Sequence, residues 1–436
     1  MGLQDLIVTP IYLILLYALA YWIRPKVTNR DTRKYFIPGL TVKFVGAIAL
    51  GLVYQFYYNG GDTFNYYYHS KVIWEVFLEN PAAGLGLIFK PDIMSGETAQ
   101  YIFRMYWYSD SASYLICRIA AFFGLFSFNT YTSIALFFAI LSFSGLWALF
   151  VHLNKKINGY SRMLALAILF FPSLIFWGSG LMKDTITLGA ICWFFVAFDR
   201  LLSKEGNFWN LFIMFVGAFL LVQIKVYIVM AMLPACAIYY VSKNLKGVEN
   251  SVIKFIAAPF VITVVGLVLV AGAGKLGEID PKYSLQQIPE TAQITAYDIA
   301  YWTGKDAGST YTLGELDGSW GSMIRLIPAA INVTLFRPYF WEVSNPLMLL
   351  SAVESFVLLF LTVYILGQKR FSVAPLVQHP LILFCISFSL IFAFAVGVST
   401  FNFGSLVRYK IPMIPFYATA LIFYTSLNKE GKLRYA

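Results

Sequence analysis

Long apolar stretches recur along this chain, and each is about as long as a bilayer is thick. Within the hydrocarbon core only helices and closed barrels satisfy their own backbone hydrogen bonds, and a helix needs about 20 apolar residues to cross it. The stretches are residues 7–23, 38–57, 130–152, 162–178, 185–201, 208–224, 227–242, 254–273, 346–367, 380–397 and 411–427. They predict an all-α, polytopic integral membrane protein, with about 11 transmembrane helices in a single transmembrane domain over residues 1–436.

The composition excludes an ordinary soluble protein. Of the 436 residues, 59% are hydrophobic and only 12% are charged, which leaves too few polar side chains to cover a water-exposed surface. A net charge of +10 would suggest nucleic-acid binding in a soluble domain, but here the basic residues lie mainly in short loops between apolar stretches. We therefore expect the lipid bilayer as a partner and no nucleic acid.

Lysines and arginines indicate the orientation, because short cytoplasmic loops carry an excess of both. Alternate loops hold the following basic residues, all of which we place in the cytoplasm: Arg24, Lys26, Arg30, Arg33, Lys34, Lys155, Lys156, Arg162, Arg200, Lys204, Lys243, Lys246, Lys254, Lys369, Arg370, Lys429, Lys432 and Arg434. The remaining loops then face outward. Two of them are long, 58–129 and 274–345, and three are short turns around Lys183, Lys225 and Arg408.

Both long extracytoplasmic loops are expected to carry interfacial helices, which lie along the membrane surface. The loop 58–129 has aromatic-rich blocks interrupted by prolines and glycines. The loop 274–345 has apolar residues at steps of three and four from Trp320 to Leu335, the spacing of one helix face. We expect an interfacial helix there, leading through Phe336-Arg337-Pro338 into the next span.

The strongest candidate for chemistry is Asp62. Gly60 and Gly61 precede it and permit a tight turn or the close approach of a ligand. Tyrosines follow it, among them Tyr66, and their rings suit a membrane boundary or the face of a sugar. The alternative is an interfacial turn in which Asp62 caps the next helix and the tyrosines are belt residues.

A second candidate is the turn that ends in Lys183 and Asp184. Asp184 suits the positive end of the next helix and is explained equally well as a cap. Lys183 is harder to explain structurally, because a cation near a helix N-terminus is disfavoured unless an anion offsets it. A phosphate would do so.

Two further outward turns carry cations. Lys225 lies in a turn so short that its side chain must be close to the apolar layer, and the alternative to a binding role is snorkelling to the interface. Arg408 and Lys410 precede a helix start marked by prolines, where they suit phosphate binding or act as interfacial anchors. Glu354 lies inside a predicted span, so it requires a partner or a polar cavity.

One early outward acid combined with several later outward cations resembles the membrane glycosyltransferases of the GT-C superfamily and the related bacterial exopolysaccharide and O-antigen polymerases. The segments that carry the resemblance are Gly60-Gly61-Asp62-Thr63 with Tyr66, the long loop behind them, Trp177–Asp184, Phe336-Arg337-Pro338 and Arg408-Tyr409-Lys410.

The resemblance implies sugar transfer from a polyprenyl-phosphate-linked donor to a glycan acceptor at the extracytoplasmic face of a bacterial cytoplasmic (inner) membrane. It makes Asp62 the catalytic base. The residues it assigns to substrate or phosphate are Tyr66, Lys183, Asp184, Lys225, Arg337, Arg408 and Lys410. It leaves a divalent metal open, because a second acid would have to come through folding from Asp92, Glu97 or Asp110.

Two other classes of function remain open. A polytopic transporter or flippase for a lipid-linked or anionic substrate would use Glu354 and the basic turns along its path. A scaffold or assembly subunit would use the long loops to bind partners. The chain contains neither a Gly-x-x-x-x-Gly-Lys-Ser/Thr phosphate loop nor a His-Glu-x-x-His metal motif, so ATP-driven and zinc-protease functions have little support.

Overall fold

The computed structural model describes residues 2–90, 96–157, 159–245, 281–304, 309–368 and 378–429, with a few single positions between them. Apart from Gly266, the predicted span 254–273 lies outside the described residues. So do the following charged residues named above: Asp92, Lys246, Lys254, Lys369, Arg370, Lys432 and Arg434. The chain forms two compact units, Met1–Lys225 and Val226–Ala436.

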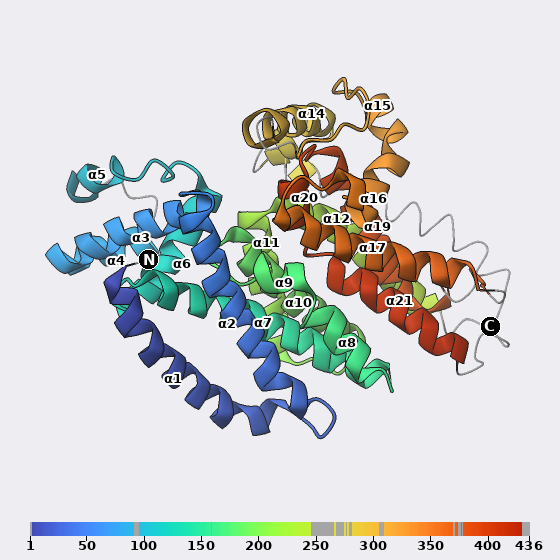
Figure 1. The fold of residues 1–436 in the computed structure, drawn as a ribbon, viewed down its shortest axis with the longest axis horizontal. Helices are drawn as coiled ribbons and strands as arrows, with labels where there is room; N and C mark the ends of the chain where they lie inside the picture. The colour runs from blue at the N-terminus through green and yellow to red at the C-terminus, as the bar shows by residue number, and fades with distance from the viewer. Residues whose placement is uncertain are drawn as a thin grey trace. The chain divides into compact units, whose positions relative to one another are not determined.

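The described residues of the first unit form eleven helices, which are labelled in Figure 1. They are α1 (Leu3–Val27), α2 (Arg33–Phe56), α3 (Asp62–Glu79), α4 (Pro81–Phe89), α5 (Gly96–Ile102), α6 (Ser111–Phe126), α7 (Tyr131–Lys156), α8 (Ser161–Ile168), α9 (Pro172–Phe176), α10 (Lys183–Leu202) and α11 (Phe208–Ile224).

The second unit is also helical over its described residues. Its elements are α12 (Val226–Leu245), η1 (Pro281–Tyr283), α14 (Ile288–Ile299), η2 (Ala300–Gly304), α15 (Trp320–Arg325), α16 (Ile327–Phe336), η3 (Phe340–Glu342), α17 (Pro346–Leu366), α19 (Pro380–Val398), α20 (Phe403–Tyr409) and α21 (Ile414–Lys429).

Seven of the described helices are long and apolar enough to cross a membrane: α1, α2, α7, α10, α12, α17 and α19. Each coincides with an apolar stretch of the sequence. The described residues contain no β-strand, only an isolated bridge between Thr310 and Asn402. The prediction of an all-α integral membrane protein is therefore confirmed, while the total of 11 spans stays a prediction.

The stretch 162–178 differs from the expectation of one spanning helix. α8 ends at Ile168, and α9 is only five residues long. Pro172 is the first residue of α9, and the residue before a proline is driven out of the helical conformation, so Phe171 is extended, with φ −73° and ψ 124°. A hydropathy average over the stretch does not reveal such a break in the helix.

In the first unit, α7 packs against α1, α2 and α10 (Figure 1). The approach of α7 to α10 depends on two glycines. A Cβ atom on Gly145 would lie only 2.3 Å from the carbonyl oxygen of Gly189, so the two backbones are in direct contact. Small residues permit such close packing where helices cross in a membrane.

The two ends of α7 carry different groups. At its start, the Tyr131 hydroxyl shares a hydrogen bond of 2.8 Å with Thr63 of α3. At its end are Lys155 and Lys156. A helix of 26 residues is about 39 Å long, which matches the thickness of a bilayer with its headgroups. The Asp62 end and the basic end of this unit are therefore a membrane thickness apart.

The described residues between 58 and 129 form a small helical bundle at the Asp62 end. α3 packs against α4 and α6, and α6 packs against α11 (Figure 1). Val72, Ile73 and Val76 form the buried face of α3. The prediction that helices form in this segment is confirmed, and their placement along a membrane surface stays a prediction.

In the second unit, α19 lies at the centre and packs against α12, α16 and α21. A Cβ atom on Gly397 would lie 2.3 Å from the Ala330 carbonyl oxygen, so α16 and α19 are also in close contact. Residues 320–335 are helical as expected, but they form two helices, α15 and α16, with a break at Leu326 beside Pro328; their placement along a membrane surface stays a prediction.

Candidate functional site

Asp62 is held by a tight turn at the start of α3. Asn59, Gly60 and Gly61 all have positive φ angles, of 53°, 136° and 110°. A side chain on Gly61 would also meet the ring of Tyr54 at 2.9 Å, so this position requires glycine. Gly61 is the N-cap residue, which corrects the alternative that gave this position to Asp62. Asp62 is half-buried in the first turn, where the helix dipole favours a carboxylate.

Lys183 lies at the start of α10 and pairs with Asp110. Its Nζ is 3.3 Å from Asp110 Oδ2. Asp110 is the N-cap residue of α6 and also accepts a hydrogen bond from the Ser113 hydroxyl. Burial opposes ionisation of Asp110, but Ser113 and Lys183 outweigh it and hold the pKa of this carboxyl below its usual value. The anion that Lys183 needs at a helix N-terminus is therefore supplied by the chain itself.

Asp184 and Lys225 form a second pair. The Lys225 ammonium donates a hydrogen bond to Asp184 Oδ1, and both side chains are buried, with 8% and 1% of their surface exposed. Snorkelling, the alternative for Lys225, is wrong because its ammonium points to this acid. Asp184 is not the helix cap, since Met182 occupies the N-cap position and Asp184 lies in the first turn.

These residues form one charged cluster, which we call the acid–lysine cluster: Asp62, Asp110, Lys183, Asp184 and Lys225. Lys183 interacts electrostatically with Asp110, Lys225 and Asp62, so the two pairs and Asp62 are neighbours. The cluster draws on the starts of α3, α6 and α10 and the end of α11. Its acids outnumber its lysines, and each lysine already faces a carboxylate.

Two other polar residues of α3 are buried beside this cluster. Tyr66 is 2% exposed, and its ring packs against Trp107 with centroids 4.8 Å apart. His69 is fully buried, and its ring lies 4.4 Å from that of Tyr106. The structure therefore places Tyr66 in the packing of α3, and its predicted role in substrate binding stays a prediction.

The second unit holds Arg337 in a two-pronged ion pair. Arg337 Nε lies 3.0 Å from each carboxylate oxygen of Glu342, and Arg337 Nη2 also donates to Glu342 Oε1. This arginine also lowers the pKa of Glu342, against the opposing effect of burial. The guanidinium lies over the rings of Tyr311 and Phe403, at 5.7 and 5.3 Å from their centroids. The guanidinium of Arg337 is thus already paired with an acid of the chain.

Lys410 and Glu354 are also buried in the second unit. Lys410 Nζ donates to the Ser355 hydroxyl at 3.0 Å and to the Arg337 carbonyl oxygen at 3.5 Å. It interacts electrostatically with Glu354, which is 4% exposed, so this acid of α17 has the partner that its position requires. Arg408 is half-buried, and its guanidinium lies 5.7 Å from the centroid of the Tyr409 ring.

Sequence reasoning missed two buried charged groups. Lys43 of α2 is 1% exposed, and its Nζ donates to the carbonyl oxygens of Leu174, at 3.0 Å, and of Gly178. Asp199 of α10 is fully buried and bonds His152 at 2.6 Å and also Lys156. A lysine inside the apolar stretch 38–57 was the available signal for the first, because charges within spans are rare and require partners.

No group of three or more metal-ligating side chains occurs among the residues that the structure describes. No family model, curated protein or solved structure matches this chain. The geometry of the site is therefore the basis for a functional assignment.

Proposed function

We propose that this protein is a membrane glycosyltransferase or polysaccharide polymerase, which transfers a sugar from a polyprenyl-phosphate-linked donor at the extracytoplasmic face of a bacterial inner membrane. The observation that supports it is the position of Asp62, a half-buried acid on a glycine turn within electrostatic range of Lys183. A base for an acceptor hydroxyl and a cation for a departing phosphate are the two charges that such a displacement needs.

In the proposed reaction the acceptor hydroxyl oxygen attacks the anomeric carbon of the donor sugar. The bond from that carbon to the phosphate oxygen breaks, and the lipid phosphate leaves with the electron pair. The Asp62 carboxylate takes the hydroxyl proton. Lys183 turns from Asp110 to the leaving phosphate, and this exchange is feasible because the Asp110 side chain is 48% exposed. Lys225, committed to Asp184, positions α10 and does not contact the phosphate.

The test uses membranes that contain the full chain and a panel of short-chain polyprenyl-phosphate and polyprenyl-diphosphate hexoses. Asp62→Asn is expected to lower turnover about 10²- to 10⁴-fold, the usual contribution of a general base. Asp31→Asn is the matched control, since Asp31 is an exposed acid in the loop between α1 and α2. Full activity of a stably inserted Asp62→Asn protein would remove Asp62 from the mechanism.

A transporter or flippase for a lipid-linked or anionic substrate is the second candidate. It is favoured by one observation, the buried charge pair of Glu354 and Lys410 in the second unit. Intramembrane acids of this kind often serve proton coupling. In liposomes the wild type would then carry the substrate unchanged to the far side, and Glu354→Gln protein would lose this flux. Substrate converted to a longer glycan without flux would exclude this candidate.

A further inference from the structure

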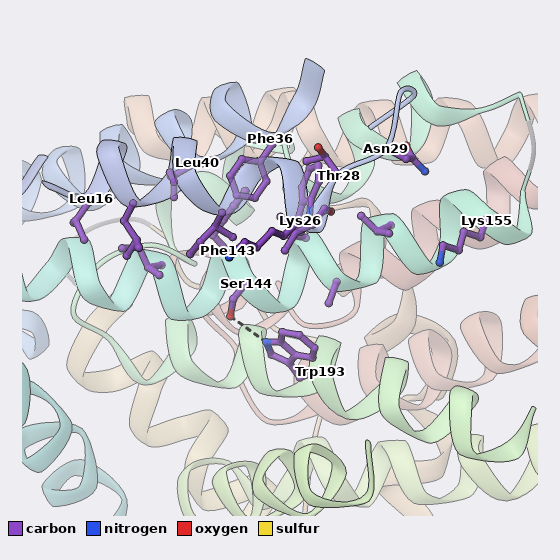
Figure 2. Close-up of a pocket in the computed structure, with 18 of the residues that line it drawn as sticks. Leu16, Lys26, Thr28, Asn29, Phe36, Leu40, Phe143, Ser144, Lys155 and Trp193 are labelled. Carbon is purple, nitrogen blue, oxygen red and sulfur yellow. Dashed lines mark hydrogen bonds between the residues drawn. The ribbon is translucent and has the colours of Figure 1, made fainter. Parts of the chain in front are cut away.

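A pocket opens at the basic end of the first unit (Figure 2). Its volume is about 520 Å³, within the range of about 300–1,000 Å³ that is usual for small-molecule sites. It lies between α1, α2, α7 and the last turns of α10. Its apolar lining includes Leu16, Leu40, Phe36, Phe143, Trp147 and Ala148.

The pocket wall is largely apolar. Phe36 packs edge-on against both Phe143 and Trp147, with ring centroids 5.4 and 4.9 Å away. The indole N–H groups are satisfied elsewhere: Trp147 donates to the Val27 carbonyl oxygen at 3.1 Å, and Trp193 donates to the Ser144 hydroxyl at 3.0 Å (Figure 2). The rings therefore offer hydrocarbon surface to an occupant, without unmet polar groups.

The rim of the pocket is basic. Lys26, Lys155 and Arg200 line it, and no acid does. Asp199, the acid next to Arg200 in the chain, is buried and bonds His152 and Lys156. The three rim cations come from the last turns of three different helices, α1, α7 and α10, whose basic ends positive-inside reasoning places at one membrane face.

An apolar slot with a cationic mouth matches one kind of molecule, a lipid with an anionic headgroup. We infer that this pocket binds one anionic phospholipid of the cytoplasmic leaflet, with an acyl chain between α1, α2 and α7 and its phosphate against Lys26, Lys155 and Arg200. The residues at the pocket opening are also of the kind found at the depth of the lipid headgroups. Lys26 Nζ lies 3.8 Å from the centroid of the Trp22 ring, and tryptophan and lysine are the residues that mark the headgroup boundary.

The inference is independent of sugar transfer, because pocket and cluster lie at opposite ends of α7. A basic residue near an anionic membrane surface contributes about 1 kcal/mol, which is about a fivefold change in affinity. Removal of one rim charge should therefore lower the affinity for an anionic lipid about fivefold and leave the affinity for a zwitterionic lipid unchanged.

The test is native mass spectrometry of the purified full chain in detergent, titrated with dioleoyl phosphatidylglycerol or dioleoyl phosphatidylcholine. Wild-type protein is expected to prefer phosphatidylglycerol. Lys155→Gln, at an exposed rim position, should reduce that preference about fivefold. Lys34→Gln removes an exposed cation that is not part of the pocket lining, and should change nothing. Ala148→Phe fills the apolar part of the pocket and should weaken the binding of both lipids equally.

Three results would overturn the inference. Equal binding of the two lipids by the wild type would remove the role of the rim. An equal loss of phosphatidylglycerol preference in Lys34→Gln and Lys155→Gln would show that general surface charge, and not the pocket rim, causes the preference. Displacement of phosphatidylglycerol by millimolar inorganic phosphate would show that the acyl chain does not occupy the slot. Thermal unfolding of each variant in the same detergent verifies that it is folded.

Discussion

The pairs Asp184–Lys225 and Asp110–Lys183 use the same residue types in one cluster and differ in burial. Asp184 and Lys225 are 1% and 8% exposed, whereas Asp110 is 48% exposed. Removal of one partner from a buried pair leaves an uncompensated charge and costs about 3–5 kcal/mol, whereas an exposed pair contributes at most about 1 kcal/mol. Lys225→Met is therefore expected to destabilise the protein severely, and Asp110→Asn only slightly.

The double replacement separates the charge from the packing. Asp184→Leu combined with Lys225→Met removes both charges and retains most of the volume, and such replacements of buried ion pairs are often neutral or stabilising. We expect the double variant to be within about 1 kcal/mol of the wild type although each single variant loses about 3–5 kcal/mol. Unfolding by SDS in mixed micelles, followed by pulse proteolysis, measures these free energies.

Additive losses of unfolding free energy in the two single variants would refute this reasoning. If the double variant lost the sum of the two single losses, the pair would not be coupled. If Asp110→Asn destabilised as strongly as Lys225→Met, burial would not be the deciding factor. If Lys225→Met kept full stability and lost only activity, Lys225 would serve the substrate, as the family resemblance implies.

Three more predictions follow from buried groups. Burial lowers the pKa of His69 from 6.5 to about 4, so the unfolded chain binds a proton at this residue more readily than the folded chain does. The free energy of unfolding should therefore fall as the pH drops from about 6.5 to 4. A His69→Gln protein with the same decline would contradict this. Gly145→Ala should destabilise by about 1–3 kcal/mol because of the contact with α10, whereas Gly86→Ala, with open space around it, should not, as thermal unfolding would measure. Arg337→Lys should lose about 1.5–3 kcal/mol in the same assay, because lysine cannot make the two-pronged contact with Glu342; an unchanged stability would refute that contact.

The spans could be predicted from the sequence wherever an apolar stretch begins and ends at a clear signal. The stretch 380–397 corresponds to α19, Pro380–Val398, because Pro380 fits the first turn of a helix and no charge interrupts the run. The stretch 162–178 has similar hydropathy but contains Pro172 at an inner position. Composition averages over that break, and only the backbone conformation at Phe171 reveals it.

The candidate residues could be named from the sequence, but not their partners. Asp62 and Lys183 stood out because outward charges on glycine-rich turns are uncommon. The Lys225–Asp184 contact joins residues 41 positions apart, and the Lys183–Asp110 contact joins residues 73 apart. No local pattern encodes such pairs, so a lysine that neutralises an internal acid looks the same in the sequence as one that awaits a phosphate.

Lys43 has a consequence for the order in which the chain is assembled during synthesis. Its partners, the carbonyl groups of Leu174 and Gly178, follow it by 131 and 135 residues. Until they emerge from the ribosome, α2 carries a lysine in mid-span at a cost of about 2.5–3.5 kcal/mol, which its apolar neighbours must offset. We therefore expect α2 to reach its final place only when α9 has been made, and a nascent chain cut before Leu174 to hold α2 loosely in the bilayer.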